Sequence, residues 1–159
     1  MNQSQSNQTT TWRRGLSVLA MLAMIVGLCA CSHAAMMFGT GARRPAVTEF
    51  GLGPRPSANK LYVATLATTR ELKPRQMQSF LIAVVDRDGQ PVEGAWMTIA
   101  GSMPQHGHGL PTRPRMTRAV TPGTYEIEGV RFNMGGWWTF KVTIGTASGE
   151  DTVTFNLSL

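Results

Sequence analysis

Apolar and polar residues alternate along most of the second half of the chain, and turn-forming residues separate the alternating stretches. The clearest example is residues 124–132, whose inward-facing candidates are Tyr125, Ile127, Val130 and Phe132, with a slip at Gly129. Alternation with a period of two is typical of a β-strand with one buried face. The same pattern predicts strands at residues 61–66, 78–85, 92–100, 116–120, 137–144 and 150–159.

These strands recur at intervals of about ten residues, a spacing typical of β-sandwiches and barrels. Turn signals lie between them, such as residues 86–91, where Gly89 can take a positive φ. After residue 60 no stretch shows a helical period. We therefore expect residues 60–159 to form an all-β domain, an antiparallel immunoglobulin-like β-sandwich of six or seven strands.

The N-terminal 30 residues show a different pattern. Arg13 and Arg14 precede an apolar run at residues 16–30, and small residues follow. A basic segment, a short apolar segment and small residues form the layout of a secretory signal. The run of about 15 residues is short for a membrane-spanning helix, which needs about 20. We expect residues 1–30 to be an N-terminal signal helix that directs export.

The end of that run, Leu28-Cys29-Ala30-Cys31, resembles the lipobox of bacterial lipoproteins. The resemblance implies cleavage after Ala30 and acylation of Cys31, for example with palmitate. Lasting attachment needs more than one acyl chain. Ser32, rather than an aspartate, follows the cysteine, a pattern that implies sorting to the periplasmic face of the outer membrane. The alternative is an uncleaved anchor helix, which also places the domain outside the cytoplasm.

Glycine and proline interrupt residues 31–59 every few positions, and no period emerges there. Such a composition is typical of a flexible tether. We predict a lipid-anchored flexible linker over residues 31–59.

The charges exclude some classes of function. The chain has 15 Lys and Arg against 9 Asp and Glu, a formal net charge of +6, but the basic residues are scattered. Nucleic-acid binding needs a basic stripe with interleaved aromatics, so we expect none. The only cysteines are Cys29 and Cys31. The domain therefore offers no disulfide, no thiol nucleophile and no thiolate metal ligand.

Catalytic signatures are also missing from the sequence. No Gly-x-Ser-x-Gly elbow occurs. Glu126 and Glu128 lie two apart in a predicted strand, where a solvated edge is a better interpretation than an acid/base pair. We therefore predict a protein that is not an enzyme.

The loop at residues 101–114 contains the most distinctive chemistry. His106 and His108 lie two apart, so in an extended segment both imidazoles project to the same side. Imidazole serves Cu(II) and thioether favours Cu(I), so a metal held here would be copper. The predicted metal ligands are Met103, His106 and His108, with Met116 and Met134 as auxiliary thioethers. A plain structured loop, or a contact with a partner protein, is the alternative.

Two tryptophans open the strand predicted at residues 137–144. Adjacent strand residues face opposite ways, so we expect one tryptophan in the core and the other exposed or at a rim. We predict that Trp137 fills the core of the sandwich.

Residues 106–114 (HGHGLPTRP) and 123–138 (GTYEIEGVRFNMGGWW) together resemble the YtkA-like domain family of bacteria. The similarity covers roughly residues 75–145 and rests on the HGHG-x-P-T loop, the Y-x-I-x-G-V-x-F-x-M strand and the G-x-W that follows. It implies a small immunoglobulin-like sandwich in an exported protein. The family is distantly similar to FixH and to copper carriers of the CopC type, which implies copper handling.

Two hypotheses follow for the whole chain. The first is a lipid-anchored extracytoplasmic binding module of the cell envelope that handles copper through the His/Met loop. The second is a structural or protein-interaction adaptor in the envelope that binds no metal and holds a partner through sheet edges or the loop. In both hypotheses the partners are the membrane, reached through the lipid, and an envelope protein.

Overall fold

A computed structural model describes residues 42–159 of the chain. Seven long strands make up most of this part, and two short strands, β1 (Arg55–Pro56) and β5 (His108–Gly109), supplement them. The long strands are β2 (Val63–Ala67), β3 (Met77–Val85), β4 (Trp96–Met103), β6 (Arg115–Thr121), β7 (Thr124–Arg131), β8 (Trp137–Thr146) and β9 (Gly149–Ser158). Within residues 42–159 the only helical element is a 3-10 turn, η2 (Val47–Glu49). The predicted all-β class is confirmed.

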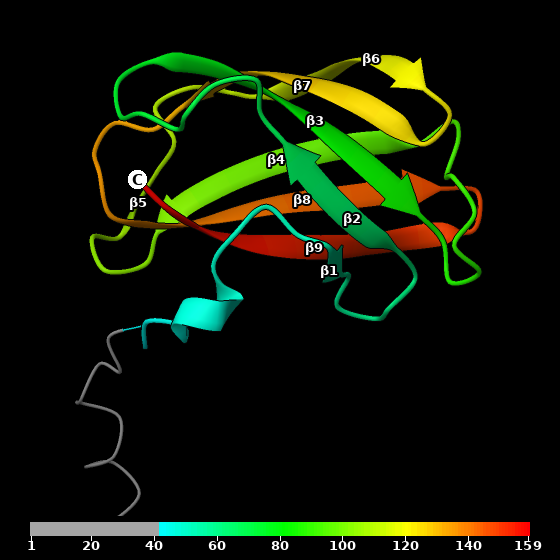
Figure 1. Ribbon diagram of the computed structural model, residues 1–159, viewed down its shortest axis with the longest axis horizontal. Coiled ribbons are helices and arrows are strands. Elements are labelled where there is room, and N and C mark those ends of the chain that lie inside the picture. The colour runs from blue at the N-terminus through cyan, green and yellow to red at the C-terminus, as the bar shows by residue number, and fades with distance from the viewer. Residues whose placement is uncertain (1–41) are drawn as a thin grey trace, which may run out of the picture. The chain divides into compact units, whose positions relative to one another are not determined.

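The long strands form two antiparallel layers, β2-β3-β7-β6 and β4-β8-β9 (Figure 1). A single residue pair, Thr98 with Arg115, joins β4 to β6 and links the layers into one continuous sheet path. In chain order the strands correspond to A to G of an immunoglobulin constant domain, which pairs A-B-E-D and C-F-G. The connectivity therefore agrees with the predicted immunoglobulin-like sandwich.

Aromatic side chains fill the space between the layers. Phe80 stacks on Phe140 with ring centroids 5.3 Å apart, and Phe132 meets Trp138 edge-on at 5.2 Å. Such pairs contribute about 1 kcal/mol each beyond the burial of their area. The inward-facing residues predicted for residues 124–132 are all buried in the core: Tyr125, Ile127, Val130 and Phe132.

The slip predicted at Gly129 is a β-bulge. Phe80 pairs with Ile127, whereas Gln78 pairs with Val130, so β7 has one residue more than β3 between these pairs. Gly129 takes a φ of 79°, the left-handed conformation that glycine adopts without steric cost. The bulge keeps Val130 on the buried face, which strict alternation would have turned outward.

The strand predicted at residues 92–100 begins later, at Trp96. Residues 92–95 instead form a loop that Tyr125 fixes from β7. The Tyr125 hydroxyl donates to the carbonyl of Val92 at 2.6 Å and accepts from the N–H of Ala95 at 3.1 Å. A side chain thus replaces the strand pairing that these buried backbone groups would otherwise make.

The flexible linker predicted over residues 31–59 is wrong for its C-terminal part. The N–H of Gly51 donates to Asn156 O at 2.9 Å, and the N–H of Ala58 donates to Thr152 O at 3.0 Å. This segment covers the edge of β9 that would otherwise be unpaired, and β1 continues by pairing with β2 (Figure 1). The compact domain accordingly includes the described residues before β1 and does not begin at residue 60.

A buried carboxylate anchors the entry to β2. Asp151 is 4% exposed, and its oxygens accept from the N–H groups of Asn59 at 2.8 Å, Leu61 at 3.3 Å and Thr152 at 2.8 Å. Burial raises the pKa of Asp151, but hydrogen bonds from the Ser57 hydroxyl and these N–H groups outweigh it and lower the pKa to about 2. The ionised carboxylate therefore stabilises this corner of the fold.

The expectation for the tryptophan pair is wrong in two respects, because the other tryptophan fills the core and neither of the two is exposed. Trp138, not Trp137, belongs to the core between the layers. Trp137 faces the other way, yet it too is buried, with 4% exposure, and its Nε1 donates to Asn156 Oδ1 at 3.0 Å. Asn156 Nδ2 in turn donates to the carbonyl of Glu49 in η2. The segment before β1 therefore covers the outer face of β8 at Trp137, which the alternating pattern predicts to be exposed to solvent.

Candidate functional site

The histidine loop is the turn of a hairpin between β4 and β5. Ser102 pairs with Gly109 and Met103 pairs with His108. The carbonyl of Met103 accepts from the N–H groups of His106, at 3.0 Å, and Gly107, at 2.9 Å. These hydrogen bonds hold the backbone of the turn, and with it the predicted ligands His106 and His108.

The hairpin brings the two imidazoles together. The ring centroids of His106 and His108 are 5.8 Å apart, with the planes tilted by 44°. His106 lies at the exposed tip, whereas His108 is half-buried at the start of β5. The two rings are therefore close enough for one ion to lie between them.

His108 has an unpartnered ring nitrogen. Its ring meets Trp138 edge-on, with centroids 5.8 Å apart and planes at 81°. Its Nε2 is buried and has no hydrogen-bond partner in the protein. A buried polar atom left unpaired costs about 1–3 kcal/mol, so it calls for a water or an ion as its partner.

Met103 lies beneath the histidines. It is 1% exposed and belongs to the core cluster. Paired residues of an antiparallel ladder have Cβ atoms about 5 Å apart, which places the Met103 side chain beside that of His108. A Cβ added at Gly136 would lie 2.9 Å from Met103 Cε, so the glycine leaves the space that the thioether occupies.

The two auxiliary methionines differ in position. Met134 is 38% exposed on the loop before Gly136, and its carbonyl accepts from Trp138 Nε1 at 3.0 Å, so its backbone borders the same cluster. Met116 follows Arg115, whose partner Thr98 lies five residues before Met103, roughly 17 Å along an extended strand. The structure therefore does not bring Met116 to the histidines.

The donors assembled at this end of the sandwich are two imidazoles and one thioether. Between residues 42 and 159, no three His, Cys, Asp or Glu side chains converge where they could hold a metal ion. Mixed imidazole and thioether sets suit copper, which accepts imidazole as Cu(II) and thioether as Cu(I). The residues present therefore fit the predicted copper ion.

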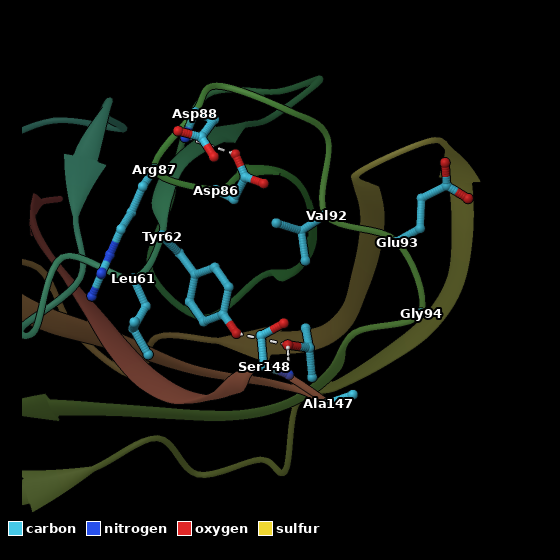
Figure 2. A pocket seen from close by; sticks show the side chains of 11 residues that line it. Leu61, Tyr62, Asp86, Arg87, Asp88, Val92, Glu93, Gly94, Ala147 and Ser148 are labelled. Carbon is cyan, nitrogen blue, oxygen red and sulfur yellow. Dashed lines mark hydrogen bonds between the residues drawn. The ribbon is translucent and has the colours of Figure 1, made fainter.

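A second hollow lies at the opposite end of β8. A cavity of about 610 Å³ opens between the β3–β4 loop, the β8–β9 turn and residues 61–62. Figure 2 shows Tyr62 in its interior, where the hydroxyl contacts Thr146 Oγ1 at 2.9 Å and donates to Gly149 O at 2.8 Å. Asp86 Oδ1 accepts from the N–H groups of Asp88 and Gln90, both at 2.9 Å. Protein partners satisfy these groups, unlike the free nitrogen of His108.

Two residues of the histidine site were not predicted from the sequence. Trp138 supplies its wall, and Gly136 leaves room for Met103. The motif around them, Gly-Gly-Trp-Trp, gave a signal for a turn and a core aromatic. It gave no signal for proximity to a hairpin some 30 residues earlier in the chain.

The predicted signal peptide at residues 1–30 and the lipidation site at Cys31 lie outside the described residues. In the part that is described, residues 42–159, no helix has the length and apolarity needed to cross a membrane.

Comparison with known proteins identifies one family. The YtkA-like family matches residues 58–143, just over half of the chain. No curated protein matches the chain. Among solved structures, the chain is similar to the ZirS C-terminal domain, with 17% sequence identity and a TM-score of 0.36. That similarity covers 78% of this chain and 88% of the other.

Proposed function

The chain belongs to the YtkA-like family, and from that premise we propose that it is a lipid-anchored extracytoplasmic module that binds copper and catalyses no reaction. The β4–β5 hairpin is the binding site, with His106, His108 and Met103 as ligands. The sandwich of this chain holds the hairpin in place, and the hairpin carries the ligands.

One observation carries the proposal: the buried Nε2 of His108 has no protein partner and lies next to a second imidazole. Neutral imidazole nitrogen is the commonest metal ligand in proteins. A bound ion would relieve the desolvation cost of this nitrogen, which the protein itself leaves uncompensated. Met103, paired with His108, adds a donor that favours copper over harder ions.

Titration with Cu(II) of the full chain, with Cys29 and Cys31 replaced by serine so that their thiols do not bind copper, tests the site. Trp138 contacts His108, so we expect Cu(II) bound there to quench part of the tryptophan fluorescence. The variant His106→Ala/His108→Ala should lose the quenching, and the matched control His33→Ala, which alters the only other histidine, should retain it. Equal copper affinity of the double variant and the parent would exclude this site.

The anchor is proposed on the sequence Leu28-Cys29-Ala30-Cys31. In a bacterial host with a lipoprotein pathway, we expect Cys31→Ala to abolish labelling by a palmitate analogue and to release the domain from the membrane fraction. Cys29→Ala is the matched control and should remain labelled. Labelling that persists in Cys31→Ala would disprove the lipobox assignment. In cells with two membranes, the serine after Cys31 favours the periplasmic face of the outer one.

The exposed edge of β6 favours the adaptor as a second candidate function. Residues 117–121 are exposed, and β6 pairs with β4 only at Arg115. An open strand edge can accept an extended segment of a partner. If this is the function, a Val120→Pro variant should lose capture of an envelope protein while copper binding is unchanged. If the Val120→Pro variant captures the envelope protein as well as the parent does, the β6 edge is not the docking site.

A further inference from the structure

We propose that the hairpin distinguishes the oxidation states of copper by depth. His106 determines the affinity for Cu(II), Met103 determines the affinity for Cu(I), and His108 serves both ions. This inference rests on the proposed copper function and adds the selectivity of the site.

The three ligands lie at successively greater depth. His106 is exposed at the turn, His108 is half-buried, and Met103 is 1% exposed. The His108 ring has the buried Trp138 and the exposed His106 as neighbours, with centroid distances of 5.8 Å in both cases. His108 thus lies between an outer ligand in water and an inner ligand in the core.

The surroundings of the inner ligand are apolar. Trp138, which contacts His108, is fully buried and meets Phe132 edge-on at 5.2 Å. Transfer of charge into such a medium costs free energy that grows steeply with the charge of the ion. A singly charged ion bound by a thioether fits this depth, whereas a doubly charged ion is better served at the mouth, where water completes its coordination.

The position of Met103 is constrained on two sides. Its register partner is His108, and its Cε lies against Gly136, where any Cβ would approach to 2.9 Å. The methyl end of the thioether is therefore held between the hairpin and the β7–β8 loop. The register places the Met103 and His108 side chains on the same face of the hairpin, so we expect Cu(I) to bind between them with little rearrangement.

The test measures both affinities on the full chain with Cys29 and Cys31 replaced by serine, because free thiols would themselves bind Cu(I). Cu(I) is measured anaerobically against a chromophoric chelator, and Cu(II) against a competing amino acid. Met103→Leu, which preserves the core volume, should weaken Cu(I) by about tenfold or more, with Cu(II) affinity changed by less than about threefold. His106→Ala should show the reverse pattern. Met116→Leu is the matched control and should change neither affinity, because Met116 lies away from the hairpin.

The outcomes separate the two proposals. If the parent binds neither ion, the copper function fails. If it binds copper but Met103→Leu weakens both ions equally or neither, only the depth selectivity fails. X-ray absorption of this cysteine-free parent gives a reading that needs no further variant: sulfur scattering with Cu(I) and none with Cu(II) is expected. Its absence with Cu(I) overturns the inference.

Discussion

The indole of Trp96 covers Gly145 on the outer face of the β4-β8-β9 layer. The two residues are register partners, and a Cβ added at Gly145 would lie 2.1 Å from Trp96 Cε2. Trp96 is nevertheless 47% exposed, so the ring has the glycine on one side and solvent on the other. An aromatic residue that covers a strand glycine compensates for the missing side chain.

We therefore expect Gly145→Ala to lower the free energy of unfolding by about 1–3 kcal/mol, because the indole must move off the sheet. In a Trp96→Ala background the same change should be neutral or stabilising by up to about 1 kcal/mol, since alanine is better than glycine in a strand. Urea denaturation of the four proteins gives the coupling free energy. If the effects of the two substitutions are additive, the contact between Trp96 and Gly145 does not contribute to stability.

The sandwich was predictable because a two-residue period records which side chains a strand buries. At 124–132 even the slip at Gly129 was readable, since glycine marked the bulge. The same reasoning failed for Trp137, whose outward face the segment before β1 shields through Asn156. The apolar and polar pattern of one strand does not show which of its side chains a distant segment will cover.

The linker and the candidate site also depend on contacts between distant segments, which the local sequence does not show. Glycine and proline are common both in flexible tethers and in irregular segments with bonded backbones, so composition could not tell that Gly51 and Ala58 pair with β9. For the site, the spacing of His106 and His108 predicted their proximity, and 5.8 Å separates the rings. Met116 fits the same chemistry, but the register places it elsewhere.

The hydroxyl of Tyr125 is a stability determinant that can be tested directly. Tyr125→Phe keeps the buried ring but leaves the carbonyl of Val92 and the N–H of Ala95 without a partner. We expect a loss of about 1–3 kcal/mol in the free energy of unfolding, the usual cost of an orphaned buried group. Tyr62→Phe removes the other tyrosine hydroxyl and serves for comparison. A Tyr125→Phe protein as stable as the parent would show that water replaces the hydroxyl.

Asp151 predicts how stability depends on pH. Its pKa of about 2 in the folded protein lies below the ordinary value of 3.8, so the unfolded chain binds more protons between these values. Stability then rises with pH in this window. The contribution of about 2 kcal/mol is fully present above about pH 4 and is lost as the pH falls through 2.

Asp151→Asn should remove this contribution, lower stability at pH 7 by about 2 kcal/mol and flatten the acid limb of the stability curve. Asp88→Asn, a change in an exposed turn, is the matched control and should leave the curve as it is. Urea denaturation from pH 2 to 7 checks both. An acid limb of unchanged slope in Asp151→Asn would assign the acid sensitivity to other carboxylates.

Gly129 isolates the cost of backbone conformation. Its φ is 79°, and the nearest atoms to an added Cβ are 3.7 Å away, an ordinary contact. Gly129→Ala should therefore cost about 1–2 kcal/mol from the left-handed conformation alone. Thermal unfolding against the parent measures it, and a larger loss would mean that the bulge itself rearranges.

Gly136 has both a positive φ and a close neighbour, and that neighbour is Met103 of the histidine hairpin. Its φ is 119°, and its added Cβ would lie 2.9 Å from Met103 Cε. Its N–H and carbonyl also pair with Leu159, so the backbone cannot move away without breaking that ladder. We expect Gly136→Ala to cost about 2–4 kcal/mol, from backbone strain and overpacking together.

The Met103→Ala background separates the two causes. Truncation of Met103 removes the clash but not the strain, so there Gly136→Ala should cost only about 1–2 kcal/mol. Chemical denaturation of the four proteins gives the coupling. An undiminished cost in the Met103→Ala background would mean that strain alone makes glycine necessary here. A diminished cost would mean that Gly136 is needed for the packing of the thioether, and the geometry of the hairpin would then depend on the β7–β8 loop as well as on the two histidines.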